Sequence, residues 1–350
     1  MKKNILLRDL DLPETRPLSR VRSIFSQRNG IFSTIERIRI QFPEAIIHFY
    51  HPNFAYAKII ARSENLSTVE TCKEEKYTFD IVIDSLNLSP FKLLLDVDKR
   101  IEKDLELVGK SKFGSSGQCV IGDEKKLFIH KNARILPHCV FDTRDGMIVI
   151  DEGTEISPFS YLGGPLYIGK NAKVDNARIT GGCIIGNRTR IGGEVENSMI
   201  NDYSNKHHEG FVGHSVIGNW VNLGALTTTS DLKNNYSEVR IKVPFTFNPY
   251  QSELVKISTG TIKFGSIIGD CSKTEIGTML NTGTVIDFGC NIFGKKPDSY
   301  SAPLSWGSNE ARYEKTRFIN DCRLIFARRQ QTTDCCFEEL VEILTGSNKI

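Results

Sequence analysis

The stretch "CIIGNRTRIGGEVENSMINDYSNKHHEGFVGHSVIGNWVNLGA", residues 183–225, repeats an aliphatic residue followed by glycine. The aliphatic residue returns at the sixth position, as from Ile185 to Ile191 and again from Ile217 to Leu223. A repeat of fixed period determines the whole architecture, so it has to be identified before any local secondary structure. The six-residue period therefore decides how the rest of the chain is interpreted.

The same period recurs, with interruptions, between residues 129 and 292. Its members are Ile129, Ile135, Phe141, Ile150, Ile156, Leu162, Ile168, Val174, Ile179, Ile185, Ile191, Val212, Ile217, Leu223, Ile262, Ile268, Thr274, Leu280, Ile286 and Ile292. Each hexad predicts one short strand and one corner of a three-sided coil, with the aliphatic residue pointing inward. A β-sandwich would instead need turn signals every 8 to 12 residues.

The segments outside the repeat have different patterns. "AIIHFYH" (45–51) and "FDIVIDSLNL" (79–88) predict strands, and "GIFSTIERIRIQF" (30–42) has helical spacing. Two more helices are expected in "NEARYEKTRFINDCRLIFARR" (309–329) and "DCCFEELVEILTG" (334–346). We therefore predict a mainly β fold with three parts: a small α/β domain at 1–110, the coil at 111–300 with a loop insertion at 229–258, and a helical extension at 301–350.

Composition excludes several classes of protein. A formal charge of +3, with both signs spread along the chain, gives no electrostatic footprint for nucleic acid. No apolar run approaches the ~20 residues of a membrane helix, and no secretion signal is expected at the start. Nine cysteines at scattered spacings are typical of reduced thiols in a cytoplasm.

Histidines and lysine gather in "NKHHEGFVGH", residues 205–214. A metal site is disfavoured because adjacent strand residues such as His207 and His208 point to opposite faces. We therefore predict no metal here. His214 is interpreted as an ordinary surface histidine, whereas His208 is a candidate catalytic base because of the sequence around it.

The segment "HHEGFVGHSVIGNWVNLGALT" (207–227) resembles the acetyltransferase half of the bifunctional N-acetylglucosamine-1-phosphate uridylyltransferases and glucosamine-1-phosphate acetyltransferases. "GGEVENSMI" (192–200), "SDLKNNY" (230–236) and "LNTGTVI" (280–286) resemble a bacterial branch of sugar nucleotidyltransferases with a hexapeptide-repeat acyltransferase domain. The resemblance implies a left-handed parallel β-helix that assembles as a homotrimer. It also implies acetyl-CoA, or another acyl-CoA, as co-substrate.

Site residues follow from the resemblance. His208 matches the catalytic histidine and Glu196 its glutamate partner. A neutral imidazole can remove the proton of an attacking amine or hydroxyl, worth about 10²- to 10⁴-fold in rate. A carboxylate can fix which ring nitrogen carries the proton. Backbone N–H groups near Gly224 and Ala225 are expected to receive the thioester oxyanion.

The remaining predicted contacts concern the two substrates. Acyl-CoA is expected along the coils at Gly224, Ala225, Thr278 and Gly283. Acceptor recognition is expected from the insertion, since a long loop in a compact repeat is commonly functional. The acceptor residues predicted are Asp231, Lys233, Asn234, Asn235 and Tyr236, with Lys206 and Arg178 as surface cations for a phosphate.

The sequence departs from the family at informative places. Residues 1–30 contain no glycine before Gly30, so the phosphate-cradling loop of a nucleotidyltransferase is missing. Asp84 and Asp96 are the candidates for Mg²⁺ ligands, should that activity survive. "GALT" stands where the family has "GAGT", and Leu226 places a large side chain beside the predicted donor site.

Three functions are therefore weighed. The leading hypothesis is an acyl-CoA-dependent acyltransferase acting on an amino sugar, a sugar phosphate or a nucleotide sugar. The alternatives are a sugar-1-phosphate nucleotidyltransferase and a non-catalytic β-helix scaffold.

Overall fold

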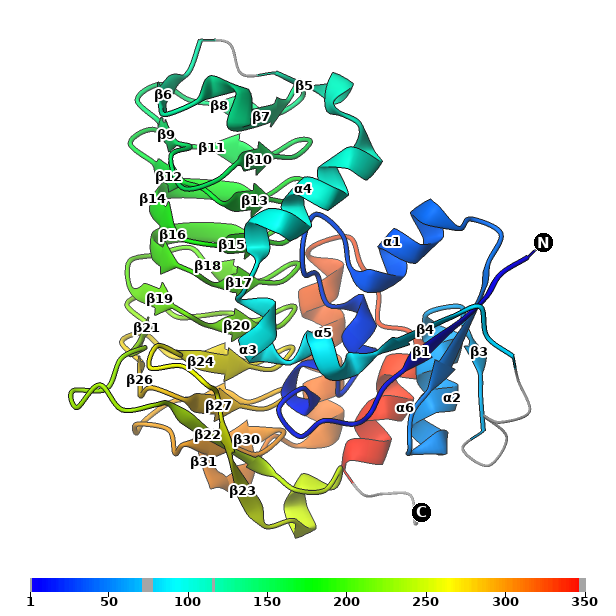
Figure 1. Ribbon diagram of the computed structural model, residues 1–350. Helices are drawn as coiled ribbons and strands as arrows, with labels where there is room; N and C mark the ends of the chain where they lie inside the picture. The colour runs from blue at the N-terminus through cyan, green and yellow to red at the C-terminus, as the bar shows by residue number, and fades with distance from the viewer. Residues whose placement is uncertain (1, 71–77, 115–116, 346–350) are drawn as a thin grey trace.

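The computed structural model describes residues 2–70, 78–114 and 117–345. Most of this chain winds into one tall column of stacked coils (Figure 1). Leu166 pairs with Ile148 in the preceding coil and with Cys183 in the following one, in parallel register. The predicted mainly β fold with parallel sheets is confirmed, whereas the left hand of the coil stays a prediction.

Each coil contributes strands to separate faces of the column. One face is a ten-stranded sheet, parallel except between its last two strands: β29 (Tyr300–Ser301), β27 (Thr284–Ile286), β24 (Ser266–Ile268), β20 (Val216–Ile217), β17 (Met199–Ile200), β15 (Cys183–Ile185), β13 (Leu166–Ile168), β10 (Ile148–Ile150), β7 (Leu127–His130) and β5 (Phe113–Gly114).

The other faces are built from a nine-stranded sheet and two smaller ones. The nine strands are β6 (Cys119–Ile121), β8 (Arg134–Ile135), β9 (Val140–Asp142), β11 (Glu155–Ile156), β12 (Tyr161–Gly163), β14 (Lys173–Thr180), β16 (Arg190–Glu196), β18 (Asn205–Lys206) and β19 (Phe211–Gly213). The smaller sheets continue these faces with β21 (Thr228–Thr229), β26 (Met279–Leu280), β25 (Lys273–Thr274), β28 (Asn291–Ile292), β30 (Ser305–Trp306) and β31 (Ser308–Arg312).

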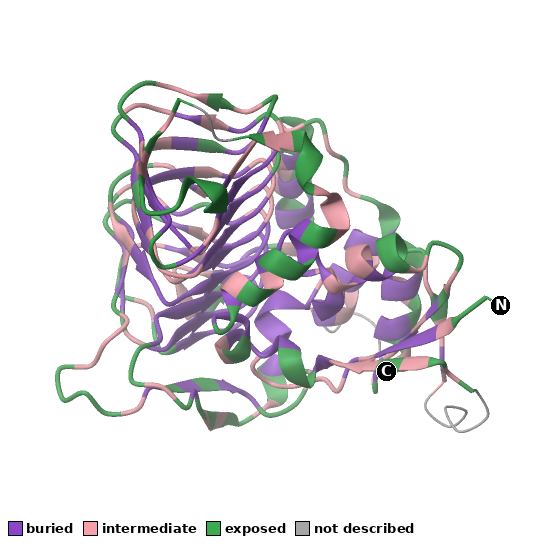
Figure 2. Cartoon of the chain, turned by 45° about the horizontal axis from the view of Figure 1, so that its top comes forward, coloured by how far each residue is buried: buried purple, intermediate pink, exposed green. Residues whose placement is uncertain are grey.

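The ten-stranded sheet is apolar on both sides. Leu166 and Ile168 point into the coil, whose interior is lined mostly by buried aliphatic residues. Tyr167, between them, points outward and belongs to a second cluster shared with the N-terminal residues. Such period-2 alternation follows from strand geometry. Figure 2 shows this face of the column as buried.

The N-terminal residues form a small four-stranded sheet, in the order β3 (Ser67–Thr68), β2 (Ile46–Tyr50), β1 (Asn4–Arg8), β4 (Ile81–Asp84). The predicted strand at 45–51 is confirmed as β2. Of the strand predicted at 79–88, Ile81–Asp84 forms β4, whereas Ser85–Leu88 turns into a 3-10 helix. Helix α1 (Thr34–Gln41) begins at a capping box between Ser33 and Glu36, and α2 (Phe54–Ser63) covers β2 and β3.

Four more helices join this part to the coil. The short α3 (Pro90–Leu93) and α4 (Val97–Val108) pack over the ten-stranded sheet (Figure 1). Helix α5 (Lys315–Ala327) runs beside the coil, and α6 (Cys335–Leu344), capped by Asp334, packs on α2. Both C-terminal helices were expected, although the predicted stop of the second at Gly346 lies outside the described residues.

The predicted insertion is an antiparallel hairpin rather than an open loop. Strands β22 (Arg240–Pro244) and β23 (Leu254–Ser258) pair directly, and β22 lies against β27. The signal was present in the sequence, because Arg240, Ile241, Lys242 and Val243 alternate polar and apolar.

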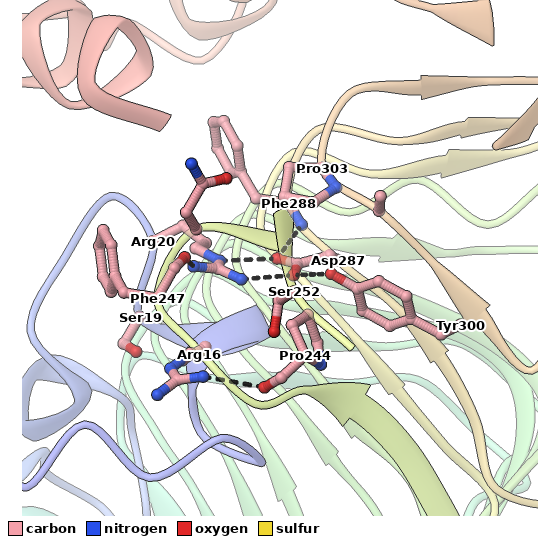
Figure 3. Close-up of polar contacts among 12 residues, drawn as sticks. Arg16, Ser19, Arg20, Pro244, Phe247, Ser252, Asp287, Phe288, Tyr300 and Pro303 are labelled. Carbon is pink, nitrogen blue, oxygen red and sulfur yellow. Dashed lines mark hydrogen bonds and ion pairs between the residues drawn. The ribbon is translucent and has the colours of Figure 1, made fainter. Parts of the chain in front are cut away.

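Arginines hold the N-terminal segment on the coil. Arg20, Arg22 and Arg28 reach Asp287, Asp270 and Asp202, which follow strands of the ten-stranded sheet. Figure 3 shows how Arg20 lies between Asp287 and the hairpin, where it also donates to the Phe247 carbonyl at 2.7 Å.

The Arg20–Asp287 pair is fully enclosed. The side chains are 1% and 0% exposed, and their closest N–O distance is 2.9 Å. Asp287 also accepts from the Tyr300 hydroxyl at 2.8 Å, so its oxygens are satisfied from both sides.

We expect Asp287→Ala to lower the free energy of unfolding by about 3–5 kcal/mol, because it leaves the Arg20 guanidinium buried without a counter-charge. Urea unfolding followed by circular dichroism measures this. The control is Glu155→Ala, which breaks the exposed pair with Arg134 and should cost under about 1 kcal/mol. Equal losses of unfolding free energy in the two variants would show that the buried pair contributes no more to stability than the exposed one.

Candidate functional site

The corners of the coil stack into three edges, and each edge carries different chemistry. At each edge a residue adopts positive φ, a conformation that non-glycine residues other than Asn and Asp rarely adopt. We name each edge after one residue of its corners, whether or not that residue itself has positive φ. The His214 edge has Gly181, Asn197, His214 and Gly283; the Trp220 edge has Asn171, Arg188, Tyr203, Trp220 and Cys271; the His208 edge has Phe159, Asn176, Gly193, Leu226 and Gly277. Backbone hydrogen bonds join neighbouring coils along each edge.

His214 is buried and paired with a carboxylate. Its Nδ1 lies 2.7 Å from Oδ2 of Asp231. Gly213 leaves room for this pair, since a Cβ there would lie 2.9 Å from the same carboxylate oxygen. The interpretation of His214 as a surface residue was therefore wrong. Its turn conformation at φ 46° directs it toward the insertion rather than into solvent.

His214 also lines a cavity of about 360 Å³. Its walls come from the N-terminal segment, α3 and its preceding turn, and the end of β23. They are mostly apolar, with Phe91, Leu94, Ile257 and Phe264 among them, and Lys263 adds a cation. A mostly apolar cavity with a few convergent polar groups is the usual form of a small-molecule site.

Glu196 lies beside this cavity, away from His208. Strand register places Glu196 next to Gly213, whereas His208 lies at the opposite end of β19. The Glu196 carboxylate is 3.6 Å from Lys263 Nζ. A single chain therefore does not bring the predicted base and its predicted partner together.

His208 is exposed at its own edge. Its ring lies 4.9 Å from that of His207, which in turn is 3.2 Å from Asp175. Partial burial is the main cause that lowers the pKa of His207. His207 is thus expected to be neutral near pH 7, and the exposed His208 ring is free to meet a substrate.

Lys206 takes the inward position of a hexad, between Ile191 and Leu223 in neighbouring coils. It is 3% exposed, and its ammonium donates to the carbonyls of Gly192 and His208, each at 2.7 Å. Burial lowers the pKa of Lys206 to about 8. The prediction of a surface cation for phosphate was therefore wrong. Lys206 holds the corner that carries His208.

The predicted acyl-CoA residues divide between two edges. Ala225 and Thr278 lie in successive coils of the His208 edge, where the Gly277 N–H donates to the Ala225 carbonyl at 2.7 Å. The Gly224 N–H already donates to Thr274, which removes it as an oxyanion donor, and among the described residues none accepts from the Ala225 N–H. Gly283 lies on the His214 edge under β22.

Only one of the predicted insertion residues reaches a site. Asp231 pairs with His214, as described. Lys233 donates to the Glu238 carbonyl at 2.6 Å, and Asn235 accepts from Ser237 within the turn. Asn234 and Tyr236 are exposed.

The other predicted ligands are engaged elsewhere. Arg178 is exposed and pairs with Glu194 on the next strand at 2.7 Å. Asp84 pairs with Arg8 and Asp96 with Lys99, on different elements. Within the described residues, no group of three or more His, Cys, Asp or Glu side chains is arranged to hold a metal ion. In that same part of the chain, helices long and apolar enough to cross a membrane are absent.

Comparisons with known proteins give partial sequence matches. No family model matches the chain. The bifunctional protein GlmU of Methanococcus aeolicus is 32% identical over 145 residues, 41% of this chain and 33% of the relative. GlmU of Wolbachia pipientis is 32% identical over 123 residues, 33% of this chain and 28% of the relative. The bifunctional sugar-1-phosphate nucleotidylyltransferase/acetyltransferase of Sulfurisphaera tokodaii is 32% identical over 151 residues, 42% of this chain and 35% of the relative.

The chain is therefore similar in sequence to part of the GlmU proteins. It spans about a third of the length of these curated relatives.

Two solved structures also align, with low scores. The acetyltransferase domain of PglB from Neisseria gonorrhoeae is 11% identical, covers 65% of this chain and 96% of its own, and has a TM-score of 0.22. A mutant of GDP-perosamine N-acetyl transferase from Caulobacter crescentus is 11% identical, covers 85% and 92%, and has a TM-score of 0.17. These scores are too low to carry an argument.

Leu226, where the sequence departs from the GlmU family, lies at the left-handed position of the His208 edge. Its φ is 63°, its side chain is 52% exposed, and its N–H donates to Glu209 at 2.7 Å. Glycine in this position carries no strain, whereas leucine costs about 1–2 kcal/mol. The exposed side chain stands beside Ala225, where the predicted acyl donor would pass.

We expect Leu226→Asn to raise the free energy of unfolding by about 0.5–1 kcal/mol, since asparagine tolerates positive φ better than leucine. Leu226→Val is the matched control and should lower it, because a β-branched residue resists this conformation. Chemical denaturation of the three proteins measures both. A stabilised valine variant would contradict the account.

We expect Lys206 to give stability a pH dependence in a defined window. Its pKa is about 8 in the folded protein and 10.5 in a free side chain. The unfolded chain therefore binds more protons between these values, and stability rises with pH across the window, by on the order of 2–3 kcal/mol. Unfolding free energies at pH 7.5 and 10.5 measure this, and Lys206→Met should lack the rise.

Lys263→Met is the control for this measurement, because Lys263 is exposed and should leave the rise intact. An identical pH profile in the wild type and Lys206→Met would show that Lys206 is solvated.

Proposed function

We propose that the protein is an acyl-CoA-dependent acyltransferase whose acceptor is an amine or hydroxyl of an amino sugar, a sugar phosphate or a nucleotide sugar. The name of one relative supports this proposal, because it combines a sugar-1-phosphate nucleotidylyltransferase with an acetyltransferase. In the structure, the observation that carries the proposal is the gathering of His208, Ala225 and Thr278 in successive coils of one edge.

The chemistry at this edge needs no covalent enzyme intermediate. The acceptor attacks the thioester carbonyl, His208 takes its proton, and the Ala225 N–H donates to the developing oxyanion. The new C–N or C–O bond replaces the C–S bond, and the thiolate of coenzyme A takes up a proton as it leaves.

A second copy of the chain would complete this edge. Leu226, Ile276 and Met279 are 52%, 72% and 55% exposed on or next to the His208 edge. Exposed apolar residues gathered at one place are typical of contacts between subunits. We propose the homotrimer that the resemblance implies, with a left-handed coil, acetyl-CoA as donor and a carboxylate for His208 supplied across the contact.

His214 is the second candidate for the base. It has what His208 lacks within one chain, an orienting carboxylate at 2.7 Å and a cavity in front of it. With Nδ1 held by Asp231, Nε2 is the nitrogen left to accept a proton.

The nucleotidyltransferase alternative finds less support in the N-terminal segment. Its arginines are occupied with coil carboxylates, as Arg20 with Asp287 and Arg28 with Asp202. No Mg²⁺ is therefore invoked. We place the protein in the cytoplasm, in keeping with eight free cysteines among the described residues.

Acyl transfer is tested by thiol release from acetyl-CoA with a panel of amino sugars and nucleotide sugars. We expect His208→Ala to lower kcat/KM by about 10²- to 10⁴-fold, the usual contribution of a general base. His214→Ala and Asp231→Asn are measured beside it. A loss confined to these two would move the base to His214.

Two further outcomes decide against the proposal. Thiol release that neither histidine variant changes would exclude an imidazole base. No thiol release by the wild type, with pyrophosphate release from a nucleoside triphosphate and a sugar phosphate, would favour the nucleotidyltransferase, and no turnover of either kind would favour the scaffold.

A further inference from the structure

The Trp220 edge carries a cluster of arginines that no function described so far uses. Arg188 lies at the left-handed corner and Arg190 begins β16 two residues later. Arg328 and Arg329 follow the end of α5. Their mutual proximity shows in Arg329, whose pKa is lowered first by burial and then by the charges of Arg190, Arg328 and Arg188.

Aromatic stacking fixes the end of α5 at this edge. Phe326 stacks on Trp220 with ring centroids 4.1 Å apart, and Trp220 stacks on Tyr203 at 4.2 Å. Tyr203 is one coil below Arg188, because its N–H donates to Asn187 at 2.8 Å. The stack therefore presents Arg328 and Arg329 beside the two arginines of the coil.

These four guanidinium groups lack counter-charges. Among the described residues, no carboxylate lies within ion-pair distance of any of them, although the arginines of the N-terminal segment are paired. Asp202, next to Tyr203 in the chain, is taken by Arg28. Nε of Arg190 is buried without a hydrogen-bond partner. Lys173, the register neighbour of Arg190, adds another cation.

Four uncompensated like charges are costly, and an anion would relieve the cost. The planar guanidinium fork matches the oxygens of a phosphate group and binds it through two parallel hydrogen bonds. We propose that Arg188, Arg190, Arg328 and Arg329 form a binding site for a phosphate ester that carries several negative charges. This site does not depend on acyl transfer, because none of its four arginines belongs to the corner of either candidate base. Arg190 is the member nearest to the His208 edge, within electrostatic range of His207.

The direct test uses inorganic pyrophosphate as probe, with the full chain at low ionic strength, by isothermal titration calorimetry. We expect Arg188→Gln and Arg329→Gln each to raise the Kd at least about tenfold, the loss expected for one good charged contact. Arg323→Gln, on the same helix but paired with Glu338, is the matched control and should bind as the wild type does.

A purely structural role is excluded by a second readout. Removing one of four repelling charges should leave the melting temperature without ligand equal or higher, while abolishing its rise on adding pyrophosphate. Wild type that does not bind pyrophosphate, or arginine variants that bind it as well as Arg323→Gln does, would overturn the proposal. His208→Ala should keep the binding, which separates this site from the proposed activity.

Two sources of phosphate can be told apart in the same assay. If the wild type binds coenzyme A more tightly than dephospho-coenzyme A, and Arg329→Gln binds the two equally, the site holds the 3′-phosphate of the acyl donor. If Arg329→Gln loses binding of a nucleoside diphosphate sugar, and the wild type binds coenzyme A and dephospho-coenzyme A equally, the site holds the phosphates of the acceptor. If Arg329→Gln binds both coenzyme A and the nucleoside diphosphate sugar as the wild type does, the proposed site is wrong.

Discussion

The structure depends on a sheet that is buried from both sides. Along each strand of the ten-stranded sheet, residues alternate between the interior of the coil and the cluster shared with the N-terminal segment. Tyr167, Ile184 and Val285 are outward-facing examples that no water reaches. Burial of apolar area at about 25 cal/mol per Å² makes such a shared face the main source of cohesion between the two parts. The paired arginines then fix where the N-terminal segment lies on it.

The three edges show how a repetitive coil acquires distinct sites. A left-handed corner turns its side chain away from the column, so a residue other than glycine is displayed there at some cost in strain. Asn197 and His214 are displayed on one edge, and Tyr203 and Trp220 on another. Helix α5 and the hairpin cover two of the edges, whereas the edge of His208 and Leu226 is left open to a partner or a substrate.

Much of the fold follows from the period of six, because an inward aliphatic residue at each hexad leaves the chain few alternatives. The same period also places Lys206 at an inward position, between Ile191 and Leu223. Its charge nevertheless led to the prediction of a surface cation. His214 and Asp231 were harder to pair. Seventeen residues and a corner separate them, and only the return of the insertion toward the cavity brings them together. Glu196 and His208 are far apart because they lie at opposite ends of β19. The spacing of the motifs in the sequence does not show this.

The docking of the N-terminal segment onto the coil has a consequence for biogenesis. Arg20 meets Asp287, and α2 packs against α6, so residues near the start of the chain have partners close to its far end. Contacts of such long sequence separation are slow to form. As the polypeptide leaves the ribosome, Arg20 and α2 are without these partners until Asp287 and α6 have been translated. Their exposed apolar surface is then a natural client for molecular chaperones.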